Sequence, residues 1–122
     1  MPNDVLVKEI LSQIHTAIVT IQLRFEPVES VDYFLDTAAG QEKLDSLCML
    51  FIAIGESLKN IDKLTNRQLL KKYGEVDWKA IKGMRDVLSH HYFDINAEAI
   101  YNVCTEELNT LESTVRLMLE DL

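Results

Sequence analysis

One segment predicts the architecture of this chain most directly: residues 41–60, QEKLDSLCMLFIAIGESLKN. Its apolar side chains recur at spacings of three and four, which is typical of an α-helix, and they share one face: Leu44, Leu47, Cys48, Phe51, Ile52, Gly55 and Leu58. The middle of this helix is apolar on nearly every side. We therefore expect it to lie centrally in a bundle or to meet another subunit. Gly55 costs about 1 kcal/mol relative to alanine inside a helix, which predicts a close backbone approach there.

Another helical pattern precedes this segment. It begins near Asn3 or Asp4, either of which can cap a helix. Its apolar stripe is Val7, Leu11, Ile14, Ile18, Ile21 and Phe25. Pro27 then breaks the pattern, and residues 30–40 predict an irregular or single-turn link.

Further helical patterns follow the central segment, at residues 67–73, at 78 to about 91, and at 97–122. Gly74 is a natural stop for the first of them. Asp77 can cap the second helix and Asn96 the last. The last helix is expected to carry one long stripe: Ile100, Cys104, Leu108, Leu111, Val115, Met118 and Leu122.

The composition agrees with these patterns. The chain has 122 residues, 48% of them hydrophobic, and only four glycines and two prolines. These values predict one all-α domain over residues 1–122, folded as an up-and-down bundle of four to five helices. Cys48 and Cys104 each lie in an apolar helical pattern, and no secretory signal is visible, so we expect a reducing, cytoplasmic location. The longest apolar run, residues 47–54, is far shorter than the roughly 20 residues of a membrane span.

The charge is unevenly distributed. A formal net charge of −8 argues against a protein that binds nucleic acid over its whole surface. Residues 59–85, however, carry eight of the twelve basic residues and three acidic ones, a charge of +5, which leaves −13 for the remainder. Two interpretations stay open for this basic segment: a solvated helix face, or a surface that steers RNA.

Residues 84–93, MRDVLSHHYF, carry the clearest chemical pattern: Arg85, four residues, His90, one residue, Tyr92. Cleavage of RNA by its own 2′-hydroxyl needs a group that exchanges a proton near neutral pH and a cation that stabilises charge on the phosphoryl oxygens. His90 can supply the first and Arg85 the second. Residues five apart on a helix point about 140° from each other. Two arrangements would bring both groups to one phosphate: the helix unwinds near His90, close to its end, or two copies pair symmetrically so that both copies of Arg85 and His90 line one cleft.

This R-x4-H-x-Y pattern resembles that of the HepT-like HEPN toxins. The surroundings resemble the family as well: Val76, Asp77, Trp78, Ile81 and Lys82 before the motif, Phe93 and Asp94 after it, and Ile54-Gly55-Glu56 upstream. The resemblance extends from about Val5 to Leu119. Ser89 and His91 depart from the family, which often has apolar or small residues there. The choice of His90 over His91 therefore rests on spacing.

The resemblance implies that the chain forms a HEPN-like homodimer, and it also implies what the chain does. The function is that of the toxin of a HEPN/MNT toxin–antitoxin system, an endoribonuclease that needs no metal and no cofactor. Arg85 and His90 would be catalytic, with Glu56, Ser89 and His91 as supporting residues. A minimal nucleotidyltransferase antitoxin would inactivate the toxin by adenylylating Tyr92, because a bulky anionic adduct would block RNA.

Other interpretations remain. Arg85, His90 and Tyr92 could form an ordinary helix end, with an extended arginine, an exposed histidine and a packed tyrosine. The chain could be a non-catalytic subunit that presents substrate to a nucleotidyltransferase, or a helical adaptor. His15 is interpreted as a residue at the edge of its helix. No Cys, Asp or Glu has the spacing that would complete a metal site with the histidines.

Overall fold

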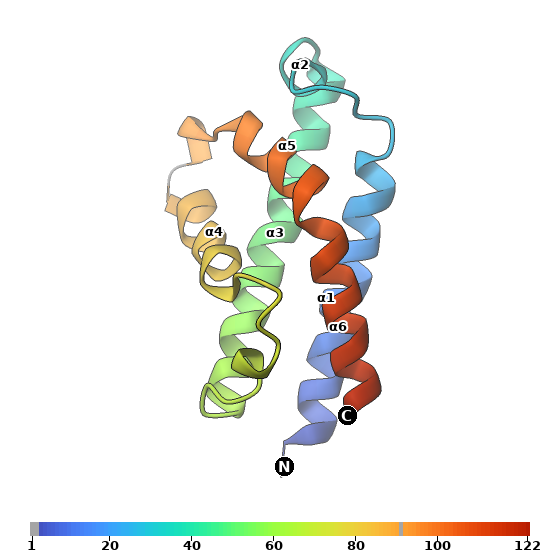
Figure 1. Ribbon diagram of the computed structural model, residues 1–122. Coiled ribbons are helices and arrows are strands. Elements are labelled where there is room, and N and C mark those ends of the chain that lie inside the picture. Colours follow the sequence, from blue (N-terminus) through green and yellow to red (C-terminus); the bar gives the residue numbers. More distant parts are fainter. Residues whose placement is uncertain (1–2, 91) are drawn as a thin grey trace.

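In a computed structural model, which describes residues 3–90 and 92–122, the chain is all-helical, as predicted (Figure 1). The described residues form six α-helices, two 3₁₀ turns and no strand. The elements are α1 (Asp4–Phe25), α2 (Asp32–Leu35), α3 (Ala38–Leu64), η1 (Leu70–Lys72), α4 (Trp78–His90), η2 (Tyr92–Asp94), α5 (Ala97–Glu106) and α6 (Leu108–Asp121). Four to five helices were expected. The difference arises where packing overrides the sequence pattern.

Helix α3 lies at the centre of the bundle. It packs against α1, α2 and α4 (Figure 1). Its buried side chains include Leu44, Leu47, Cys48, Phe51, Ile54, Leu58 and Ile61. Contact with three helices accounts for a helix that is apolar nearly all round. A subunit interface on its remaining face stays a prediction.

Helix α3 extends past the predicted residues 41–60 at both ends, and it starts earlier because its first turn is capped at Thr37. The Thr37 hydroxyl accepts a hydrogen bond from the backbone N–H of Gly40, at 3.0 Å, and so starts the helix at Ala38. A Cβ on Gly40 would lie 1.8 Å from the Tyr33 carbonyl oxygen. Only glycine allows α2 to approach α3 this closely.

The turn after α3 differs from the prediction. Asn66 and Arg67 both have positive φ, 53° and 61°. Because a left-handed residue cannot continue a right-handed helix, the predicted helix 67–73 is wrong, and one 3₁₀ turn, η1, stands in its place. Gly74 has no positive φ and so does not provide the expected C-terminal stop.

The predicted bounds of α1 and α4 are confirmed. α1 buries the predicted stripe except Phe25, which is partly buried. Asp77 caps α4, because its carboxylate accepts a hydrogen bond from the Ala80 N–H at 3.0 Å. Asn3 does not cap α1 with its side chain. Its amide instead donates to the Leu64 carbonyl at 3.0 Å, tying the start of α1 to the end of α3.

The single last helix of the prediction is divided into α5 and α6 at Glu107. Asn96 caps α5 as expected, accepting from the Ala99 N–H. The Tyr101 hydroxyl then donates to the Glu29 carbonyl at 2.9 Å, and its ring centroid lies 5.4 Å from that of Phe25. These contacts tie α5 to the end of α1 and the residues that follow it. Helix α5 runs at an angle to α6 (Figure 1). The bend therefore comes from tertiary packing, since no glycine or proline marks it.

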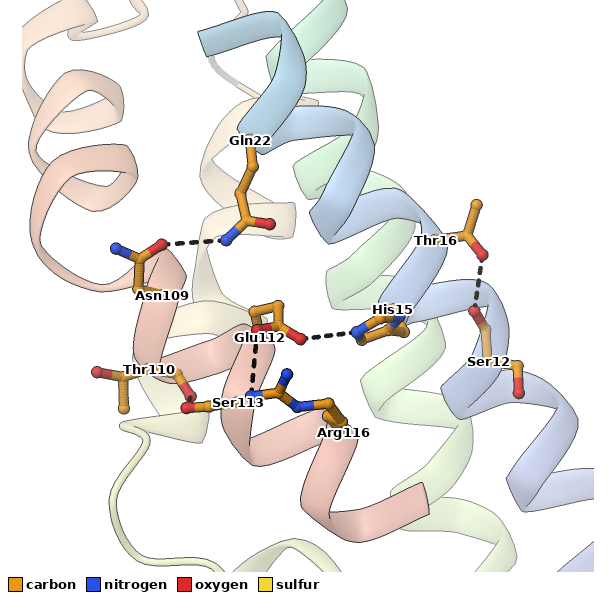
Figure 2. A network of polar contacts seen from close by, with 9 residues as sticks. All are labelled: Ser12, His15, Thr16, Gln22, Asn109, Thr110, Glu112, Ser113 and Arg116. Carbon is orange, nitrogen blue, oxygen red and sulfur yellow. Dashed lines mark hydrogen bonds and ion pairs between the residues drawn. The ribbon is translucent and has the colours of Figure 1, made fainter. Parts of the chain in front are cut away.

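Polar contacts join α1 to α6 (Figure 2). His15 Nε2 lies 2.8 Å from a Glu112 carboxylate oxygen, and Arg116 lies 3.8 Å from the other oxygen. The Gln22 amide donates to Asn109 at 3.0 Å. His15 thus bridges two helices. Among the described residues, no group of three or more His, Cys, Asp and Glu side chains could hold a metal ion.

Within residues 3–90 and 92–122, none of the helices is both long enough and apolar enough to cross a membrane.

Candidate active site

Helices α3 and α4 come into close contact at the motif arginine. A Cβ on the buried Gly55 would lie 2.6 Å from the Arg85 Cβ and 3.5 Å from the Lys82 carbonyl oxygen. The close approach expected from a glycine in a helix interior is therefore confirmed, and its partner is Arg85. The absence of a side chain at Gly55 lets the arginine stem lie against the α3 backbone.

The guanidinium of Arg85 lies between two carboxylates. Its Nε lies 2.9 Å from a Glu56 carboxylate oxygen and forms an ion pair with it. The N–H bond is not directed at that oxygen, so the buried Nε–H has no hydrogen-bond partner among the described residues. Its Nη1 donates to Asp86 at 3.1 Å. The Arg85 side chain is 31% exposed, so the stem is covered and the charged end reaches the surface.

Asp86 connects this arginine to α3. The same carboxylate oxygen that accepts from Arg85 also accepts from the Lys59 ammonium at 3.0 Å. The hydrogen bond from Lys59, followed by that from Arg85, holds the pKa of Asp86 below its ordinary value. Asp86 therefore stays charged to lower pH than a free carboxyl, and it fixes one end of the guanidinium.

His90 is kept apart from Arg85 in one copy of the chain. It is the last residue of α4 and is exposed. In the described residues no hydrogen bond or ion pair joins it to Arg85. α4 is a regular helix between them, so the side chains diverge by about 140° and stand about 7.5 Å apart along the axis. Ser89, beside His90, is also exposed.

The structure describes Tyr92 only in part and does not describe His91. His91 lies outside the described residues. For Tyr92 the structure describes the backbone, which begins η2, but the side chain lies outside the description. The roles expected for both residues stay predictions.

A basic groove of about 590 Å³ runs between the C-terminal part of α3 and the N-terminal part of α4. We call it the α3–α4 groove. Its cations are Lys59, Lys63, Arg67, Lys79 and Lys82, and its carboxylates are Asp62 and Asp86. The basic segment predicted from the sequence therefore folds into a concave surface, and Asp86, at its edge, also contacts the motif arginine.

The sequence interpretation missed Asp86 as a contact of the arginine, and it missed Lys59 as the second donor to Asp86. A signal was available, because Lys59, Asp62 and Lys63 recur at helical spacing, as do Lys79, Lys82 and Asp86. Each set predicts one charged helix face. That the two faces meet follows only from the packing of α3 on α4.

Comparison with known proteins gives consistent matches. The family model described as HepT-like, "Ribonuclease HepT-like", matches residues 10–118. The chain is 39% identical over 67 residues to "Putative RNase TTE0752" of Caldanaerobacter subterraneus subsp. tengcongensis, covering 55% of this chain and 56% of that protein. It is 32% identical over 69 residues to "Putative RNase MJ0127" of Methanocaldococcus jannaschii, covering 57% and 54%. The matches thus span about half the length of these relatives. No solved structure gives a significant match.

Proposed function

Because the chain belongs to the HepT-like ribonuclease family, we propose that it is a metal-independent endoribonuclease, the toxin of a HEPN/MNT toxin–antitoxin pair. The names of its relatives support an RNA substrate. Within the chain, the observation that carries the proposal is the placement of Arg85. Its stem lies against Gly55, and Glu56 and Asp86 fix its orientation.

A fixed guanidinium suits phosphoryl chemistry. The Nη2 group of Arg85 makes no hydrogen bond or ion pair with the described residues. Its two N–H groups are therefore available to a phosphate oxygen. Because the contacts to Glu56 and Asp86 already order the side chain, little conformational entropy is lost when substrate binds.

The proposed reaction uses the 2′-hydroxyl of the RNA as nucleophile. His90 takes the hydroxyl proton, the 2′-oxygen forms a bond to phosphorus, and the bond from phosphorus to the 5′-oxygen breaks. A protonated histidine returns a proton to the departing 5′-oxygen. Arg85 stabilises the charge that grows on the non-bridging oxygens.

The geometry of α4 supports a symmetric dimer for this reaction. Arg85 and His90 diverge on one helix, so a single copy does not direct both at one phosphate. Two α4 helices facing across a two-fold axis would bring the arginine of one copy near the histidine of the other. The two His90 copies could then act as base and acid.

We further propose that Tyr92 is the regulatory position. A partner nucleotidyltransferase would attach AMP to its hydroxyl, placing a bulky anionic group two residues after His90. Glu56 is proposed to orient Arg85, and Ser89 and His91 to support His90.

The decisive assay is RNA cleavage by the purified chain in the presence of a metal chelator. We expect Arg85→Ala and His90→Ala to lower kcat roughly 10²- to 10⁴-fold, while His91→Ala retains most activity. Arg85→Lys should recover little, because lysine lacks the planar fork. If Arg85→Ala and His90→Ala cut RNA as fast as the parent, the proposal is wrong.

A second assay tests the supporting and regulatory residues. Glu56→Ala should lower kcat, and adding it to Arg85→Ala should cause no further loss, since it acts through the arginine. Intact-protein mass measurement after incubation with the partner transferase and ATP should show added AMP on the parent and none on Tyr92→Phe. AMP on the Tyr92→Phe protein would contradict the assignment.

A further inference from the structure

The α3–α4 groove contains cations that no acidic side chain among the described residues neutralises. Two of its five are paired, Lys59 with Asp86 and Lys82 with Asp62. The other three, Lys63, Arg67 and Lys79, are exposed and form no ion pair with any described residue. The groove thus has a surplus of three positive charges on a chain whose formal net charge is −8.

The paired residues hold the groove in shape. Each ion pair runs from α3 to α4, so the pairs fix the separation of the two walls. The unpaired cations come from three places: Lys63 from α3, Lys79 from α4 and Arg67 from the turn between the helices. Opposed cations on fixed walls are suited to an anionic chain that lies between them.

Gly83 lines the groove. It lies inside α4, and a Cβ there would have no atom within 4 Å. No close packing requires this glycine, although it costs about 1 kcal/mol relative to alanine in a helix interior. The space that it leaves is part of the groove, which suggests that room for a ligand accounts for it.

The groove leads to the proposed catalytic arginine. Asp86 lines the groove and accepts a hydrogen bond from Arg85. Lys79 and Asp86 are seven residues apart on α4, so this wall is about 10 Å long. An anionic chain that enters beside Lys79 would reach the guanidinium within a few repeats of its backbone.

We propose that the α3–α4 groove binds the phosphate backbone of single-stranded RNA next to the phosphate that is cleaved. This inference rests on the proposed function and names the strand geometry and the path of the substrate. A single strand is favoured because the cations line one short groove. At physiological salt, charges more than about 8 Å away are largely screened, so the acidic remainder of the chain need not repel a strand lying in the groove.

The test compares two double variants with the same change in charge. Lys63→Gln with Lys79→Gln removes two groove cations, and Lys8→Gln with Arg24→Gln removes two exposed cations of α1. Both are made in the His90→Ala chain, so that RNA stays intact. The probe is a fluorescent single-stranded oligoribonucleotide, and its Kd is measured over a range of salt concentrations.

We expect the groove variant to weaken binding roughly tenfold or more. It should also reduce the slope of log Kd against log salt by about 1.4, the value for two lost phosphate contacts on a single strand. The α1 variant should stay within about twofold of its parent. With His90 restored, the groove variant should have a raised KM and an almost unchanged kcat.

Equal weakening by both variants would overturn the inference, since it would indicate a general charge effect. Unchanged RNA binding by the groove variant would also overturn the inference. So would a groove variant that still binds RNA but no longer binds polyglutamate, since that result would indicate an acidic polypeptide as the occupant. The proposed function fails separately. If the parent chain cuts no RNA but the groove variant alone loses RNA binding, the groove stands without the ribonuclease.

Discussion

Two glycine-to-alanine substitutions should have opposite effects on stability, although both glycines lie inside helices, because Gly55 lies in the close α3–α4 contact and Gly83 faces open space. Gly83→Ala adds a methyl group into open space, so it should gain the helix propensity of alanine, about 1 kcal/mol. Gly55→Ala gains the same propensity, but its Cβ would lie 2.6 Å from the Arg85 Cβ. Overpacking of this kind costs about 1–3 kcal/mol.

The expected net effects are a gain of about 1 kcal/mol for Gly83→Ala and a loss of about 1 kcal/mol for Gly55→Ala. For a chain of this length the two melting temperatures should differ by about 8 °C. Urea unfolding followed by circular dichroism gives the free energies, with equal m-values as the check on a common two-state transition. RNA cleavage should fall in Gly55→Ala, because relieving the clash moves Arg85. If Gly55→Ala is as stable as Gly83→Ala, the close approach does not exist.

Three further predictions concern groups outside the site. Burial, and after it the hydrogen bond to Asp121, raises the pKa of Tyr73 from 10.0 to about 12. The stability that this hydroxyl adds is therefore complete below pH 10 and is lost as the pH rises toward 12. In urea unfolding, the difference in unfolding free energy between the parent and Tyr73→Phe should shrink over that pH interval. Burial raises the thiol pKa of Cys48 to about 11 and of Cys104 to about 12, so a thiol reagent should label them only when urea unfolds the chain, and rapid labelling of the native protein would contradict this. Glu112→Ala removes the contact with His15 that joins α1 to α6, together with the pair to Arg116 within α6, and should lower the free energy of unfolding by about 1 kcal/mol, with RNA cleavage unchanged.

The sequence predicted the helices whose ends are set by local chemistry. Helix α4 begins where Asp77 can accept a backbone hydrogen bond, and α1 ends just before Pro27. Such signals lie within a few residues of the boundary that they determine. The all-α class followed from the same local periodicity. That residues 1–122 form a single domain stays a prediction.

The prediction failed where distant contacts decide the backbone. Nothing local marks the bend at Glu107, which depends on Tyr101 reaching the end of α1. Arg67 is an ordinary helix former by propensity, yet it adopts a left-handed conformation in the turn after α3. At Glu107 and at Arg67, the helical spacing of the sequence continues although the backbone changes direction there.

The candidate site divides in the same way. The Ile54-Gly55-Glu56 segment and the arginine motif were both visible in the sequence, and the family resemblance pointed to Glu56 as a supporting residue. Their contact, and the joining of Arg85 to Lys59 through Asp86, depend on the register of α3 against α4. That His90 acts together with Arg85 of a second copy, and that Tyr92 is the regulatory position, stay predictions.

The anchoring of Trp78 provides an optical probe of the proposed RNA path. Trp78 is the only tryptophan in the chain, and its side chain is 8% exposed. Its indole N–H donates a hydrogen bond to the Tyr73 carbonyl at 2.8 Å. The next residue, Lys79, lies in the wall of the groove. The fluorescence emission of a buried, rigidly held indole changes when a ligand binds beside it or when its hydrogen bond to the Tyr73 carbonyl breaks. Ligand titrations can therefore be followed in the unlabelled protein, by its own fluorescence.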